Sequence, residues 1–124
     1  MAPTENPSIV VVTTNYVPGM KITKVLGPTF GIIVRSRGLG GNIVAGLRGI
    51  VGGEINEYTK MLSESREHAL QRMMEQAQAL GANAVIGMSF DSADIGQIMT
   101  EVVAYGTAVV VEPETGKSTP VSLR

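Results

Sequence analysis

The chain has 124 residues and a mass of 13.0 kDa, which is enough for one domain and excludes a two-domain enzyme. Its formal charge is -1, so it lacks the basic excess that binding to nucleic acid phosphates requires. It has no cysteine and one histidine, His68, which excludes disulfides, thiolate metal sites and a site built from several histidines.

The two ends are expected to be flexible, and residues 8–111 to form the single domain. Residues 1–7 and 112–124 contain mainly polar residues and prolines, which favour mobile ends. The N-terminus has no basic segment, and its apolar run, Ile9–Val12, is too short for a secretion signal. No run of about 18 apolar residues is present, so we expect no contact with a membrane and a location in the cytoplasm.

Two strands are expected first. The segment Ser8–Thr14 is β-branched almost throughout, which is typical of a strand. The segment Ile22–Ser36 predicts a second strand, which Gly27, Pro28 and Gly31 should bend or bulge.

Two helices of unequal length should follow. Between Gly38 and Gly53, apolar residues at spacings of three and four predict a short amphipathic helix. A long amphipathic helix of about seven turns should begin near Glu54, whose carboxylate suits a first helical turn. It should end at Gly81, which suits the left-handed residue that follows many helices.

Two further strands are expected at Ala84–Phe90 and Ile98–Val111, joined by a polar loop at Asp91–Gly96. The predicted fold class is therefore α+β: a two-layer ββ(α)αββ subunit with a mainly antiparallel sheet and one long helix packed on it.

Three blocks of the sequence carry a family resemblance. They are Gly52-Gly53-Glu54-Ile55 with Tyr58-Thr59, Ser65-Arg66 with Ala69-Leu70 and Arg72-Met73, and Leu80–Gly87. Together they resemble the YbjQ-like family, over roughly Ile9–Val111. The resemblance implies a small α+β subunit that assembles as a ring-shaped homopentamer, and it brings a family label of heavy-metal binding.

The strands also favour self-association without reference to any family. Ile9–Val12, Ile32–Val34 and Val109–Val111 are unbroken apolar runs, which are typical of strands covered on both faces. One long and one short helix can cover one face of a four-stranded sheet. We therefore expect further copies of the chain to cover the other face. The alternative is a monomer in which these runs lie at strand ends.

Arg66 is the most informative polar residue, because it falls within the apolar stripe of the long helix. A guanidinium there needs a carboxylate, carbonyls or an anionic ligand. We expect an ion pair with Glu101, buried or at an interface, and an anion clamp is the alternative. Glu54 and Tyr58 complete the set of ligand or interface candidates.

His68 lies on the polar face of the same helix. With Glu64 and Gln71 it has the spacings at which helix side chains meet, and Glu75 lies two turns away. These residues could hold a divalent metal ion weakly, and an exposed histidine among helical charges is the alternative.

Three functions remain open from the sequence. The first is a non-enzymatic homo-oligomer that binds a small ligand, an ion or a partner in crevices between subunits. The second is a metal-binding protein that uses His68, Glu64 and Glu75. The third is a small hydrolase or isomerase with its site at a subunit junction.

Overall fold

The computed structural model describes residues 9–36, 50–51 and 54–114. The predicted flexible ends lie almost wholly outside the described residues, and so does most of the predicted short helix. Ile50 and Val51, the last apolar residues of that segment, do not belong to a helix, because they form β3 (Ile50–Val51), which pairs antiparallel with β4 (Glu54–Ile55).

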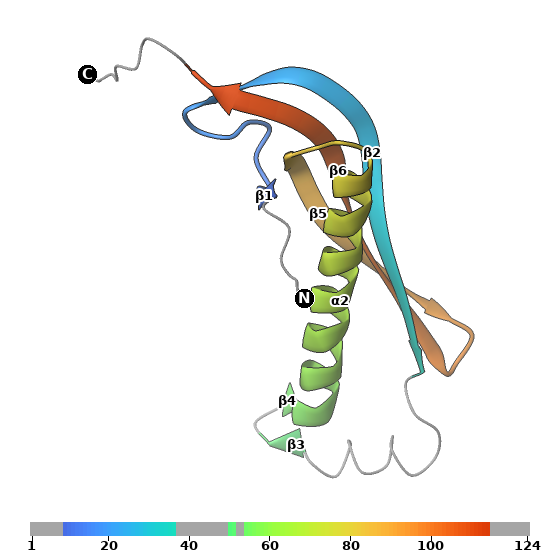
Figure 1. The fold of residues 1–124 in the computed structure, drawn as a ribbon. Coiled ribbons are helices and arrows are strands. Elements are labelled where there is room, and N and C mark those ends of the chain that lie inside the picture. The colour runs from blue at the N-terminus through green and yellow to red at the C-terminus, as the bar shows by residue number, and fades with distance from the viewer. Residues whose placement is uncertain (1–8, 37–49, 52–53, 115–124) are drawn as a thin grey trace, which may run out of the picture.

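One helix packs on one face of a four-stranded mixed sheet (Figure 1). The strand order is β1-β5-β6-β2, where the strands are β1 (Val10–Val11), β5 (Ala84–Ile95), β6 (Met99–Pro113) and β2 (Met20–Ser36). The β1–β5 pair is parallel, and the other two pairs are antiparallel. The predicted α+β class is confirmed.

The helix α2 (Asn56–Ala79) starts two residues later than expected and ends where its sequence signal predicts. Gly81 has a φ of 97°. Its N–H donates to Gln78 O at 2.9 Å, and the N–H of Ala82 donates to Ala77 O at 3.0 Å. This is the Schellman arrangement, which satisfies the last helical carbonyls. No helix in the described ranges has an apolar stretch long enough to cross a bilayer.

Bulges bend two of the strands. In β2 the register shifts between Ile22 and Lys24 and again between Val25 and Gly27, close to the predicted position. In β5 a bulge lies between Ile86 and Ser89. There the N–H groups of Gly87 and Met88 donate to Thr14 O and Val12 O, so the bulge turns the backbone of β5 toward the segment after β1.

The polar segment Asp91–Gly96 is largely strand, and the prediction of a loop there is wrong. Asp91 pairs with Val103 and Ala93 with Glu101. Ladder bonds to the apolar strand β6 hold these polar residues in extended structure, since pairing context outweighs the low strand propensity of aspartate. The turn itself follows at Gly96, whose φ is 63°.

The main core lies between α2 and the sheet. Met73, Val85 and Val102 are fully buried there, together with the small residues Ala69, Ala77, Ala104 and Ala108. Gly31 of β2 meets the helix backbone directly, because a Cβ at that position would collide with Ala69 O and Met73 N. Glycine is therefore required where helix and strand approach most closely.

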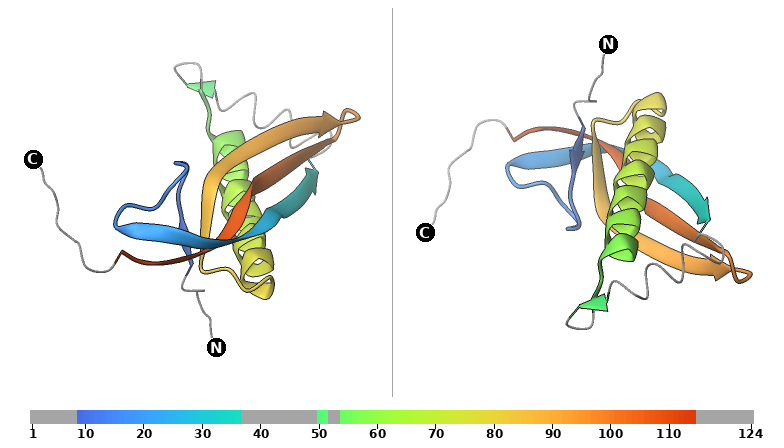
Figure 2. Two further views of the ribbon diagram at one scale, coloured as in Figure 1. Left: turned by 90° about the horizontal axis from the view of Figure 1, so that it is seen from above. Right: turned by 90° about the horizontal axis from the view of Figure 1, so that it is seen from below.

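A second, smaller core lies on the opposite face of the sheet, which we call the outer face. It consists of Val17, Ala84, Val109 and Val111, with Val12 and Met20 packed against them. The segment between β1 and β2 thus covers one end of the outer face (Figure 2 shows this segment beside the sheet). Asn83 fastens this end, since its side chain donates to Val111 O and accepts from Val111 N.

Candidate functional site

Side chains of α2 bind the free edge of β2. Gln76 Oε1 accepts from Phe30 N at 2.6 Å and from the hydroxyl of Thr29 at 3.1 Å. Arg72 Nη1 donates to Ile32 O at 3.0 Å. The two side chains pair backbone groups that point away from β6, so they close part of an edge that would otherwise stay open. One feature of the sequence is consistent with this role: Arg72 and Gln76 are polar residues four apart beside the apolar stripe.

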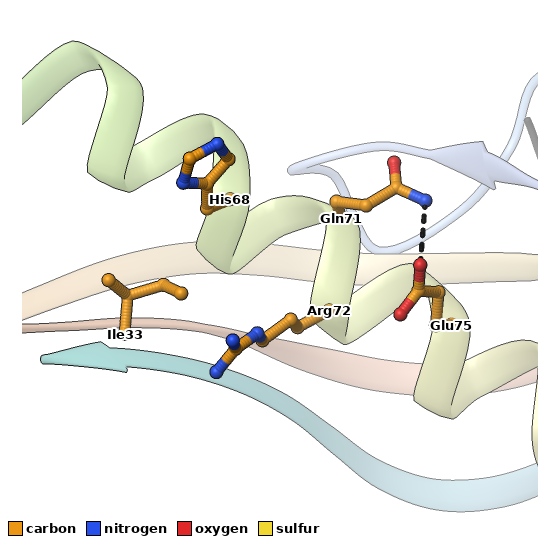
Figure 3. Close-up of a pocket in the computed structure, with 5 residues that line it drawn as sticks. All are labelled: Ile33, His68, Gln71, Arg72 and Glu75. Carbon is orange, nitrogen blue, oxygen red and sulfur yellow. Dashed lines mark hydrogen bonds between the residues drawn. The ribbon is translucent and has the colours of Figure 1, made fainter.

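A crevice of about 310 Å³ lies beside this contact, between α2 and β2. Its lining residues are Ile33, His68, Gln71, Arg72 and Glu75 (Figure 3). Gln71 Nε2 donates to Glu75 Oε2 at 3.1 Å, and Arg72 is held by Ile32 O. The crevice therefore presents an imidazole, a guanidinium and a carboxylate. The guanidinium and the carboxylate each already have a hydrogen-bond partner.

The predicted metal ligands are only partly brought together. His68 and Glu75 line the crevice, and Glu64 does not. Within the described ranges no three residues of the types His, Cys, Asp and Glu are close enough to hold a metal ion. The guanidinium of Arg72 beside His68 opposes a cation, and the chain has no soft thiolate donor. The described residues therefore do not fit a heavy-metal site.

Arg66 lies on the core stripe of α2, as its position in the sequence predicts, and yet its side chain is exposed. Its guanidinium carbon is 5.2 Å from the centre of the Phe90 ring, a cation–π distance. Leu62, one turn earlier on the same stripe, is exposed as well, with 39% of its surface accessible. The strands cross the helix at an angle, so the sheet does not cover this half of α2 (Figure 1).

Glu101 lies on the outer face of β6, half-buried, with Met99, Val103 and Tyr105. The expected ion pair between Arg66 and Glu101 is not formed within the subunit. Residues alternate between the faces of a strand, and Thr100 and Val102 on either side of Glu101 are buried beneath the helix. Arg66 is on the helix side of the sheet, so the two charges point away from each other.

The outer face around Glu101 is apolar and open. It carries large side chains from β2, β5 and β6 that are 39–51% exposed: Phe30, Ile32, Val34, Ile95 and Tyr105. They share the face because Phe30 pairs with Tyr105, Ile32 with Val103, Val34 with Glu101 and Ile95 with Met99. We call these five residues and Glu101 the open strip.

The two remaining candidates from the sequence lie just before α2 and in its first turn. Glu54 is in β4 and Tyr58 is in the first turn of α2. Their side chains are outside the described part of the structure.

A family model described as "Putative heavy-metal-binding", of the YbjQ type, matches residues 9–112. The chain belongs to this family. Among similar curated proteins are UPF0145 proteins from Methanoregula boonei, 66% identical over 93% of this chain and 96% of the relative, and from Thermoplasma volcanium, 65% identical over 87% and 88%. A third, from Bradyrhizobium sp., is 60% identical over 86% and 96%.

A solved structure has the same fold as this YbjQ-type chain. It is the crystal structure of a protein of unknown function from Pediococcus pentosaceus, assigned to the DUF74 family. The TM-score is 0.58 at 15% identity, and the match covers 84% of this chain and 98% of the other. The family model and the curated relatives confirm the resemblance to the YbjQ-like family that the sequence blocks indicate.

Proposed function

We propose that this YbjQ-type protein is a non-enzymatic subunit that assembles with copies of itself, as the pentamer that the family resemblance implies. The assembly binds a small ligand, an ion or a partner in crevices where subunits meet. The observation that carries the proposal is the open strip, an apolar surface at the uncovered end of the outer face that the subunit itself leaves exposed.

The size of the exposed side chains supports assembly. Phe30, Ile32 and Val34 follow one another on alternate positions of β2, and each is 46–51% exposed. Fully covering a Val, Ile or Phe side chain contributes about 1.5–3 kcal/mol relative to leaving it exposed. Contiguous apolar surface of this kind is typical of an interaction site rather than of surface open to water.

The crevice on the helix side supports binding rather than catalysis. It holds an imidazole, a guanidinium and a carboxylate, from His68, Arg72 and Glu75, and the described residues that line it include no hydroxyl or thiol nucleophile. Arg72 and Glu75 are each engaged in a hydrogen bond with a neighbouring group. A neighbouring subunit that adds one wall to this exposed crevice would give a small polar ligand the enclosure that binding requires.

Light scattering at low micromolar concentration tests the proposal. We expect the wild type to scatter as an oligomer and Ile32→Lys to scatter as a monomer, because a lysine in the strip places an ammonium group against apolar surface. Leu80→Lys is the matched control, since Leu80 is 44% exposed and lies at the far end of α2. A monomeric wild type would refute assembly.

A further inference from the structure

The open strip and the exposed half of the α2 stripe have opposite charge. The strip holds the carboxylate of Glu101, and Asp91 lies on the same face, paired with Val103 two register positions away. No lysine, arginine or histidine is on this part of the outer face within the described strands. The exposed helix surface formed by Leu62 and Arg66 is apolar around one permanent positive charge.

Neither charge has a partner of opposite sign in the described part of its own subunit. Among the described residues, Arg66 contacts the ring of Phe90. Glu101 is flanked across the strands by Val34 and Ala93, which offer it no hydrogen-bond donor from a side chain. Covering either surface with a purely apolar partner would bury an uncompensated charge, which is strongly unfavourable.

Two open strips facing each other would also be unfavourable. In such a two-fold arrangement the same surface meets itself, and because this part of the outer face has carboxylates and no basic residue within the described strands, neither Glu101 nor Asp91 would gain a positive partner. A contact between two different surfaces of the same chain avoids this, and such head-to-tail contacts generate rings.

We propose that the open strip of one subunit is covered by the N-terminal half of α2 of a second subunit, with Leu62 packed on the strip and Arg66 paired to Glu101 across the contact. This inference rests on the proposed assembly and goes further, because it names the two surfaces that meet and the ion pair that sets their orientation. The pair that cannot form within a subunit then forms between subunits.

Charge reversal tests the pair. We expect Arg66→Glu and Glu101→Arg each to raise the dissociation constant of the assembly by about 30-fold or more in sedimentation velocity, because each places like charges together in the contact. The double variant Arg66→Glu/Glu101→Arg restores an opposite pair and should recover most of the affinity. This double variant also answers the objection that a single variant has simply misfolded.

The controls are reversals of exposed charges elsewhere on the same two elements. Lys60→Glu changes the opposite side of α2, and Glu112→Arg changes the far end of β6. Both should assemble as the wild type does. Single reversals at Arg66 and Glu101 that assemble normally would overturn the pair and leave self-assembly standing, whereas a monomeric wild type would overturn both.

Cross-linking tests the orientation of the two subunits. Because the chain has no native cysteine, every cross-link must come from the introduced cysteines. A short bis-maleimide suits the distance better than a disulfide, which requires closer Cα atoms than an arginine–glutamate pair has. A mixture of Arg66→Cys and Glu101→Cys subunits should give covalent dimers, and either variant alone should give none. Self-linking of Glu101→Cys alone, or no linking in the mixture, would overturn the head-to-tail contact.

Discussion

The two ends of the outer face differ in how they are covered. At one end the central strand is covered: Val109 is 0% exposed, because Val17 and its neighbours between β1 and β2 pack on it, although its edge-strand partner Val25 is 65% exposed. At the other end Val34, also on the outer face, is 51% exposed. The same residue type on the same face of one sheet thus belongs to the core in one place and to the surface in the other.

This difference separates folding of the subunit from assembly. The covered end is closed by chain segments of the same subunit and contributes to the free energy of unfolding of that subunit. The open strip contributes little to it, because exposed side chains gain little from folding. Substitutions at the two ends should therefore affect different measurements.

The largest effect should come from a matched pair of valine substitutions. Val109→Asp places a carboxylate in the covered cluster without a partner, and we expect it to cost about 3–5 kcal/mol of subunit stability and to prevent folding. Val34→Asp should leave the subunit folded and abolish assembly. Circular dichroism during urea denaturation, with light scattering on the same samples, separates the two results. If Val34→Asp also unfolded, the two ends would not be independent.

The next effect sharpens the comparison within β2 itself. Gln76 accepts hydrogen bonds from the backbone N–H of Phe30 and from the hydroxyl of Thr29. The backbone of the open strip is therefore held by the subunit's own helix, whereas the side chains of the strip are exposed. Gln76→Leu leaves the N–H of Phe30 unsatisfied, whereas the Thr29 hydroxyl keeps its bond to Met73 O, and the free energy of unfolding should fall by about 1–3 kcal/mol. Gln76→Glu keeps the accepting oxygen and should retain most of the stability. Equal loss in both variants would show that the hydrogen bonds contribute nothing.

The smallest effect should be at the helix-side crevice, which is separate from both ends of the outer face. We expect His68→Ala to leave calorimetric titrations with Zn²⁺, Ni²⁺ and Cu²⁺ unchanged, because Arg72 lies beside His68 and Glu75 is bound by Gln71. Gln78→Ala, an exposed substitution on the same helix, is the control. A stoichiometric site that disappears in His68→Ala alone would restore the metal-binding interpretation.

Much of the fold could be predicted because it follows from local patterns. The 3.6-residue period predicts α2, Gly81 marks its end, and Gly27 marks the bend in β2. The strand Asp91–Ile95 could not be predicted, because its extended form depends on pairing with β6 and not on its own residues. The close contact of helix and strand at Gly31 was likewise invisible, since the sequence suggested only an interruption there.

The site was harder to predict than the fold. The sequence singles out Arg66 and Glu101 as charges among apolar residues, but it leaves open whether their pair would be buried in the subunit or lie at an interface. Alternation along β6 assigns Glu101 to the face with Tyr105, but the sequence does not say which face the helix covers. The roles of Arg72 and Gln76 depend on how close α2 lies to β2, which no local pattern specifies.

The side chains that fasten α2 to β2 have a consequence for the behaviour of the protein at high concentration. An exposed outer strand can recruit the same strand of another molecule, and repetition of that step produces fibrils. Arg72 and Gln76 occupy two of the backbone groups such recruitment would use. These two hydrogen bonds therefore make the long edge strand β2 a poorer template for amyloid growth than a fully open edge would be.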